Sequence, residues 1–244
     1  MSLYRDQGVV LRTYKLGEAD RIVVLMTAGH GKVRAVAKGV RKTRSRFGGR
    51  LEPPSNASLL LYEGRQLDII SQAESIDHFR PIRDDLVRMT DAMALLEAVD
   101  QTVQEREPDA RLYQMLVAAL RTLADSPRRS PLLVAAFYWK LLSLEGFGPL
   151  LDSCASCATS VVEGAELIAF DLSQGGALCR TCRRGVPVSP AALALMRRVL
   201  EGGLAGALAE PASPTVSEVA SLAIHSMEQH LERRLRAVRI LDQA

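Results

Sequence analysis

Four cysteines form the pattern in this 244-residue sequence that most directly indicates chemistry. Cys154 and Cys157 make one C-x-x-C pair, and Cys179 and Cys182 make a second pair after a gap of 21 residues. Each such pair can present two thiolates from one tight turn, and two pairs complete a tetrahedral shell for zinc. Because four thiolates leave no coordination position for water, the spacing predicts one structural zinc ion per chain. Another metal, a redox use of the thiols, and unliganded or disulfide-bonded cysteines are the alternatives.

A run of eight basic residues without an acidic neighbour is the second such pattern. Residues 1–80 hold 14 Lys and Arg against 8 Asp and Glu, a net charge of +6, whereas the rest of the chain has a net charge of −3. Such a run repels itself unless an anion is near, so it indicates a phosphate-binding surface or, alternatively, a solvated charged loop. The candidate phosphate-binding residues are Lys32, Arg34, Lys38, Arg41, Lys42, Arg44, Arg46 and Arg50.

Aromatic residues are scarce around this basic run. Phe47 lies inside the run, where its ring would either stack on a base or pack back onto the domain. The scarcity of aromatics favours electrostatic, sequence-tolerant binding over base readout.

Sequence motifs of common enzymes are missing. There is no phosphate-binding loop, no H-E-x-x-H and no G-x-S-x-G, and the only H-x-E, which begins at His230, follows the cysteines instead of preceding them as in zinc deaminases. The four histidines are scattered. We therefore expect a protein that is not an enzyme.

Short β-rich segments separated by turn-forming residues predict five strands near 7–13, 20–26, 31–38, 57–63 and 67–73. Five strands within about 75 residues favour a small barrel, and the OB-fold is the obvious candidate. In the third strand the two-residue period places Lys32, Arg34 and Lys38 on one face and apolar residues on the other. The long connection 39–56 that follows is typical of a functional loop.

After residue 80 the apolar period becomes helical. We expect helices with one apolar face over 86–103 and 112–123, a buried helix from Ser130 to Glu145, a helix from Ser189 to Gly202, and a final helix capped by Thr215 and Glu218 that reaches Leu241. The expected fold class is α+β and multidomain. It comprises a five-stranded OB-fold barrel over residues 1–80 and an α-helical domain over 81–244, with an inserted four-cysteine, zinc-ribbon-like segment at about 148–187.

Neither a membrane span nor a signal peptide is expected. No stretch approaches the roughly 18 consecutive apolar residues that a span requires, and the first ten residues include charges where a signal peptide would be apolar. The expected location is the cytoplasm, in association with the nucleoid.

Several motifs in the first 65 residues resemble, in order and spacing, the bacterial recombination mediator family RecO. They are E-A-D-R-I-V from Glu18, T-A-G-H-G-K from Thr27, A-K-G-V-R-K from Ala37 and S-R-F-G-G-R-L-E-P from Ser45. The segments LLSLEGFGPLLDSCASC and FDLSQGGALCRTC resemble the cysteine-bearing part of the same family.

This resemblance implies a non-catalytic mediator of DNA repair that binds single- and double-stranded DNA and anneals complementary strands. It makes the eight basic residues of the run, from Lys32 to Arg50, the expected DNA contacts. It implies association with RecR, and help to RecA in replacing single-stranded DNA-binding protein (SSB). The acidic tail of SSB would bind the helical domain, with Arg197 and Arg198 or Arg233 and Arg234 as the candidate contacts or a second DNA surface. A zinc-dependent nuclease, an RNA-binding OB-fold factor and a partner-binding adaptor are the rival interpretations.

Overall fold

The computed structural model describes residues 2–43, 45 and 47–237. The chain forms two compact units: one runs up to Pro127 and includes the C-terminal residues from Arg236, and the other is Arg128–Leu235. The expected boundary at residue 80 falls inside the first unit, which contains the barrel together with the helices that follow it. The division into domains 1–80 and 81–244 therefore stays a prediction. No described helix is both long and apolar enough to cross a membrane.

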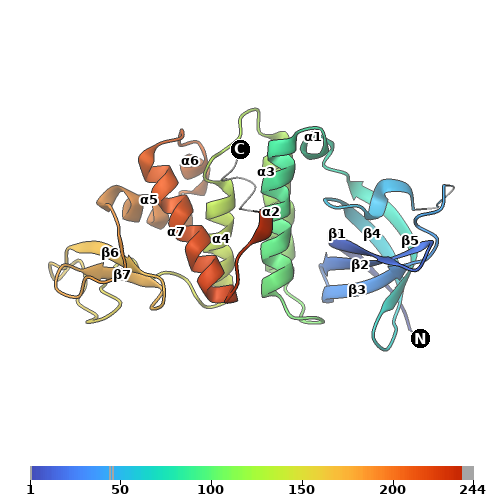
Figure 1. The fold of residues 1–244 in the computed structure, drawn as a ribbon, viewed down its shortest axis with the longest axis horizontal. Helices are drawn as coiled ribbons and strands as arrows, with labels where there is room; N and C mark the ends of the chain where they lie inside the picture. The colour runs from blue at the N-terminus through green and yellow to red at the C-terminus, as the bar shows by residue number, and fades with distance from the viewer. Residues whose placement is uncertain (1, 44, 46, 238–244) are drawn as a thin grey trace. The chain divides into compact units, whose positions relative to one another are not determined.

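The first unit contains a closed barrel of five strands in the order β1-β2-β3-β5-β4, in which only β3 and β5 are parallel. This order confirms the OB-like barrel and all five predicted strands (Figure 1). The elements are β1 (Leu3–Leu16), β2 (Asp20–Thr27), β3 (Gly31–Ala37), the 3-10 helix η1 (Gly48–Leu51), β4 (Asn56–Tyr62), β5 (Asp68–Asp77), α1 (Arg80–Arg83), α2 (Leu86–Thr102) and α3 (Ala110–Asp125).

A β-bulge in β1 reverses which side chains face the barrel interior. Val10 lies opposite Leu25, and both belong to the barrel core, but after the register shift Arg12 lies opposite Val24. An extra residue in one strand inverts the two-residue alternation from that point on. As a result Arg12 and Tyr14 lie on the outer face of the barrel, where an uninterrupted strand would have turned them inward.

The alternation predicted for β3 is confirmed. Val33, Ala35 and Ala37 are buried in the barrel core, whereas Lys32 and Arg34 are only half-buried on the outer face. The strand therefore stabilises the barrel with one face and presents cations with the other.

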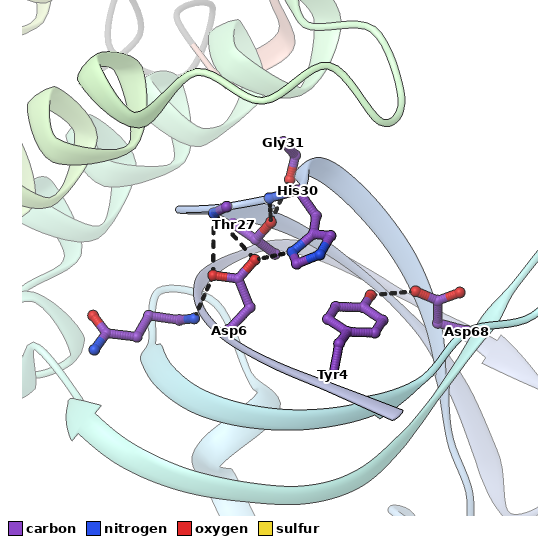
Figure 2. A network of polar contacts seen from close by, with 8 residues as sticks. Tyr4, Asp6, Thr27, His30, Gly31 and Asp68 are labelled. Atoms are coloured by element: carbon purple, nitrogen blue, oxygen red, sulfur yellow. Dashed lines mark hydrogen bonds and ion pairs between the residues drawn. The ribbon is translucent and has the colours of Figure 1, made fainter. Parts of the chain in front are cut away.

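The turn between β2 and β3 is held by hydrogen bonds from both sides. Asp6 accepts from the backbone N–H of Gly29 with both oxygens at 3.1 Å, and its Oδ2 lies 2.6 Å from Nδ1 of His30. Thr27 donates its hydroxyl to the carbonyl of Gly31 at 2.9 Å. Figure 2 shows the Asp6 carboxylate directed at the turn and at the His30 ring, and Thr27 bonded to the backbone of the turn. The T-A-G-H-G-K motif therefore has a structural role at this turn.

A buried carboxylate fixes the loop between α2 and α3 to the barrel. Asp68, which is fully buried, accepts a hydrogen bond from the hydroxyl of Tyr4 (Figure 2) and forms an ion pair with Arg106 at 2.6 Å. Burial and the hydrogen bond to Asp68 raise the pKa of Tyr4, so its hydroxyl stays a donor. The backbone N–H of Arg106 also donates to the carbonyl of Lys32 at 3.0 Å. The loop thus extends the barrel next to β3.

Gly31→Ala is expected to destabilise the first unit strongly. Gly31 has φ +65°, and a Cβ added there would lie 2.0 Å from the carbonyl oxygen of Glu107. The backbone strain alone costs about 1–3 kcal/mol, and the overlap adds to it. Gly17→Ala is the matched control, because Gly17 has φ +57° with nothing within 4 Å of the added Cβ. Urea denaturation of both variants measures the difference, and equal losses would show that the approach of Glu107 does not matter.

The two longer helices of the first unit differ in how well their burial was predicted. In α3 the apolar face of Leu112, Leu116 and Leu120 is buried, as expected. In α2 burial extends almost all round from Thr90 to Asp100, whereas Leu86 is 81% exposed, so the prediction of one apolar face was wrong. Contacts on more than one side of a helix remove the single-face pattern.

The second unit combines helices with a small three-stranded sheet of order β7-β6-β8, of which Figure 1 labels β6 and β7. This confirms a helical part carrying a cysteine-bearing insert. Trp139 and Tyr138 of its first helix are among the largest fully buried side chains. Its elements are α4 (Leu133–Leu144), β6 (Leu167–Asp171), β7 (Gly176–Cys179), β8 (Val186–Pro187), α5 (Pro190–Leu200), α6 (Leu204–Leu208) and α7 (Pro214–Leu231).

The predicted cap of α7 was wrong. The helix begins at Pro214, and the hydroxyl of Ser213 accepts from a backbone N–H of its first turn, because a Ser-Pro pair offers both a cap and a rigid first residue. Glu218, expected to pair with Thr215, instead accepts hydrogen bonds at 2.6 and 2.7 Å from Ser189 at the start of α5. The carboxylate therefore joins two helix starts.

Two other helix ends also differ from expectation. The first helix of the second unit begins at Leu133, because Pro131 and Leu132 form a turn after Ser130. The last one ends at Leu231, since Glu232 adopts a left-handed conformation with φ 51°. The expected end at Leu241 lies outside the described residues.

Candidate metal centre and nucleic-acid interface

The fold brings the four cysteine thiols together, as their spacing predicts. The sulfur atoms of Cys154, Cys157, Cys179 and Cys182 all lie within 4.8 Å of one another. Those of Cys157 and Cys179 are 3.8 Å apart. Four sulfurs at about 2.3 Å from one zinc ion stand about 3.8 Å apart in a tetrahedron. The cluster is therefore a site that could hold a metal ion of this size.

Backbone hydrogen bonds hold the two C-x-x-C turns against each other. Cys179 is the last residue of β7, and its N–H donates to the sulfur of Cys154 at 3.4 Å. The N–H of Ala155 in the first turn donates to the carbonyl of Ala177 in β7 at 2.9 Å. A Cβ added to Gly176 would lie 2.8 Å from the Cβ of Leu150 and 2.9 Å from that of Ala155. Glycine at this position therefore lets the first C-x-x-C turn pack closely against β7. The sheet therefore positions all four thiols.

The thiols differ in acidity. Burial opposes ionisation of Cys154, but N–H groups donated by Cys179 and Cys157 lower its pKa to about 6. Contact with the sulfurs of Cys157 and Cys179 raises the pKa of Cys182 to about 12. Four thiolates in this space repel one another unless a cation neutralises them, which is the chemistry of a metal site.

Among the predicted DNA-binding residues, Lys32 makes an internal contact. Its ammonium donates to the carbonyl of Asp100 at 2.7 Å, and half-burial lowers its pKa. Arg34 lies 3.5 Å from Glu105, and the side chain remains 40% exposed. Lys32 therefore connects β3 to α2, and Arg34 connects β3 to the loop that follows α2. Of the two side chains, Arg34 keeps the larger exposed surface available for a ligand.

The remaining basic residues lie on the loop after β3. Lys38 and Lys42 are exposed, and Arg50 is half-buried. Arg41 donates to the carbonyls of Gly17 and Glu18 in the β1–β2 turn at 3.3 and 2.9 Å, which fixes the start of the loop against that turn. Arg44 and Arg46 lie outside the described residues. The structure thus brings Lys38, Arg41 and Lys42 to one end of the barrel.

Phe47 is a core residue. It is 1% exposed and belongs to the barrel core, so of the two possibilities for this ring the structure shows the packed one. The exposed tyrosines of the barrel are Tyr14 and Tyr62, at 38% and 41%. Sequence reasoning missed Tyr14 because its orientation depends on the bulge in β1.

The candidate arginines of the second unit divide into two pairs. Arg197 pairs with Asp152 and Arg198 with Glu210, each at 2.7 Å. Arg233 and Arg234 are exposed beyond the end of α7. All four arginines therefore lie at least partly at the surface of the second unit.

A cavity of about 670 Å³ that sequence reasoning missed opens beside α4 and α7. Its lining includes Trp139, Phe147, Phe170 and His230, and Phe147 is 60% exposed. The indole Nε1 of Trp139 and the hydroxyl of Ser226 are buried without a hydrogen-bond partner among the described residues. The cavity therefore combines exposed aromatic surface with polar groups, as small-molecule and peptide sites do.

Comparison with known families gives matches over almost the whole chain. The family model described as recombination protein O N terminal matches residues 1–79. The model described as recombination protein O C terminal matches residues 83–239. The first match covers the barrel and the second covers the helices and the cysteine cluster.

Proposed function

Since the chain belongs to the recombination protein O family of DNA recombination and repair mediators, we propose that it acts by binding single- and double-stranded DNA and annealing complementary strands. In this proposal it works with RecR to help RecA replace SSB on single strands, in the cytoplasm and at the nucleoid. It does so without catalytic turnover.

The observation that carries the proposal is the exposed basic end of the barrel. Lys38 and Lys42 are exposed, and Arg41 anchors their loop to the β1–β2 turn. The β1–β2 loop of an OB-fold commonly contacts oligonucleotides, and Arg41 lies against it. Cations that neutralise phosphates allow two strands to approach while their bases stay free to pair. This is sufficient for annealing and requires no bond chemistry.

We assign the cysteine cluster a structural zinc ion. The ligands would be Cys154, Cys157, Cys179 and Cys182. The zinc ion would cross-link the two C-x-x-C turns. With four protein ligands the ion has no position for substrate, which supports a non-catalytic role.

A nucleic-acid comparison tests the proposal against its rivals. Single-stranded DNA, duplex DNA and RNA of matched length are titrated with the full chain, and labelled DNA is incubated with the protein and Mg²⁺ or Zn²⁺. The proposal expects DNA binding at least equal to RNA binding and no cleavage products. Tighter binding of RNA would favour an RNA-binding factor, because the 2′-hydroxyl is what distinguishes the two. Cleavage would identify a nuclease.

For the SSB tail we propose the cavity beside α4 and α7. The aromatic part of its lining, which includes Phe147 and Phe170, would take apolar side chains. Glu232 also lines the cavity, and Arg233 and Arg234 follow it directly in the chain. Both arginines are exposed, and their positive charge favours an acidic peptide.

Phe147→Ala is expected to weaken binding of an SSB tail peptide by at least about tenfold, because an apolar side chain that loses its contact costs about 1.4 kcal/mol or more. Trp139 is the only tryptophan in the chain and lines the cavity, so its fluorescence reports binding directly. Val162→Ala, at a residue 98% exposed and outside the cavity lining, is the control. An unchanged tryptophan signal with the wild-type protein would place the tail elsewhere.

A further inference from the structure

A band of half-buried apolar side chains crosses the outer face of the barrel. Tyr14 lies opposite Ile22 of β2, Ile22 lies opposite Val36 of β3, and Val36 pairs with Ile69 of β5. Ile22, Val36 and Ile69 are half-buried and Tyr14 is exposed. The bulge before Arg12 is what turns Tyr14 onto this face. Bulges that redirect a side chain are over-represented beside functional sites.

Cations flank this band on both sides. On one side of the band, the next set of outward-facing residues places Val24 of β2 between Arg12 of β1 and Arg34 of β3. On the other side Lys38 follows the end of β3, and Arg41 lies against the β1–β2 turn. A face that is apolar along its middle and basic along its edges matches a strand whose bases are apolar on their faces and whose backbone is anionic.

The ring of Tyr14 is held in place before any ligand arrives. The guanidinium of Arg12 lies 4.7 Å from the ring centroid, in a cation–π contact. Arg12 is in turn fixed by an ion pair at 2.7 Å with Asp100, whose side chain is 4% exposed. The tyrosine keeps 38% of its surface exposed. A side chain that is already ordered loses less conformational entropy when it binds.

We propose that Tyr14 stacks on a base of single-stranded DNA and so gives the barrel a preference for single strands over duplexes. The faces of unpaired bases are open to an aromatic ring, whereas those inside a duplex are covered by their neighbours. The basic loop residues contact phosphates of either form, so they contribute affinity without this discrimination. This inference rests on the proposed DNA-binding function and assigns one residue within it.

Titration of the full-length chain with a labelled single-stranded oligonucleotide and with a duplex of equal length tests the role of Tyr14. Tyr14→Ala is expected to lower affinity for the single strand by about 5- to 150-fold and affinity for the duplex by less than about twofold. The slope of log K against log salt stays the same, because no charge is removed. Tyr14→Phe retains the ring and is expected to bind like the wild type. Ile76→Ala, at an apolar residue near the end of β5 that is 40% exposed and outside the band, is the control.

A second readout is 2-aminopurine placed in the single strand. Its emission is expected to fall on binding to the wild type and to Tyr14→Phe, and to remain high with Tyr14→Ala. The inference would be overturned if Tyr14→Ala bound the single strand as tightly as the wild type does. It would also be overturned if the variant lost affinity equally for the single strand and for the duplex. Tighter binding of a matched RNA would overturn DNA as the ligand. If the wild-type chain binds no DNA even at low salt, the proposed function itself fails.

Discussion

Charge reversal at Lys38, Arg41 and Lys42 to glutamate is expected to flatten the salt dependence of DNA binding. These residues form the basic end of the barrel, and two of them are exposed lysines, whose ammonium groups act as point charges on flexible stems. If five cations of the segment meet phosphates, log K for single strands falls against log salt with a slope of about −3.5, at about −0.7 per contact. Loss of three contacts leaves a slope of about −1.4.

The control for this triple variant is the same charge reversal on the helices of the first unit. Arg80, Arg111 and Arg121 have side chains that are 88%, 78% and 55% exposed. Their reversal changes the net charge of the chain equally but lies outside the basic loop. Fluorescence anisotropy over a salt series measures both variants. A slope that stays near the wild-type value in the loop variant, or falls equally in the control, would place the DNA surface elsewhere.

Replacing Cys154 and Cys179 by serine is expected to abolish zinc binding and destabilise the second unit. One ligand from each turn is removed, and the thiols that remain cannot close a tetrahedral shell. Mutating a residue that only hydrogen-bonds to a metal ligand lowers metal affinity by about 10- to 100-fold. Removing two of the ligands themselves is expected to lower zinc affinity by more than that. The purified wild type is expected to contain one zinc per chain and the variant none, by elemental analysis. Thermal unfolding with and without chelator reports the stability that the metal provides.

Acidification provides a second way to remove the metal. Thiolates must take up protons before they release zinc, and the pKa of Cys154 is lowered to about 6 by the N–H groups around it. Because protons compete with zinc for the thiolates, bound zinc and the stability that it provides are expected to be lost as the pH falls. For the double cysteine variant, Ser153→Ala next to the first turn is the control, and it is expected to retain zinc. Zinc retained in the double cysteine variant would contradict a site made by these four thiols.

The strands were predictable because each carries its own local signal. In β3 the alternation of Val33, Arg34 and Ala35 fixes which residues are buried, and a glycine turn precedes it. The cysteine cluster was predictable for a related reason, since two C-x-x-C turns specify a metal site wherever the chain brings them together. Such features need little knowledge of distant contacts.

Features that depend on distant contacts were not predictable. The bulge that turns Tyr14 outward appears only in the pairing of β1 with β2. Lys32 has the sequence pattern of a surface cation, yet its ammonium donates to a carbonyl on α2, far along the chain. Glu218 matches the spacing of a capping box, but Ser189 from another helix binds it instead. In each case a residue remote in sequence decides the outcome.

The most direct test of the central claim is to follow annealing itself. Fluorescence anisotropy of a labelled single-stranded DNA is recorded with the wild-type chain over a salt series, and the complementary strand is then added. The account predicts tight binding that weakens steeply with salt, followed by pairing that is faster with protein than without. No binding at low salt, or binding that slows pairing of the two strands, would contradict it.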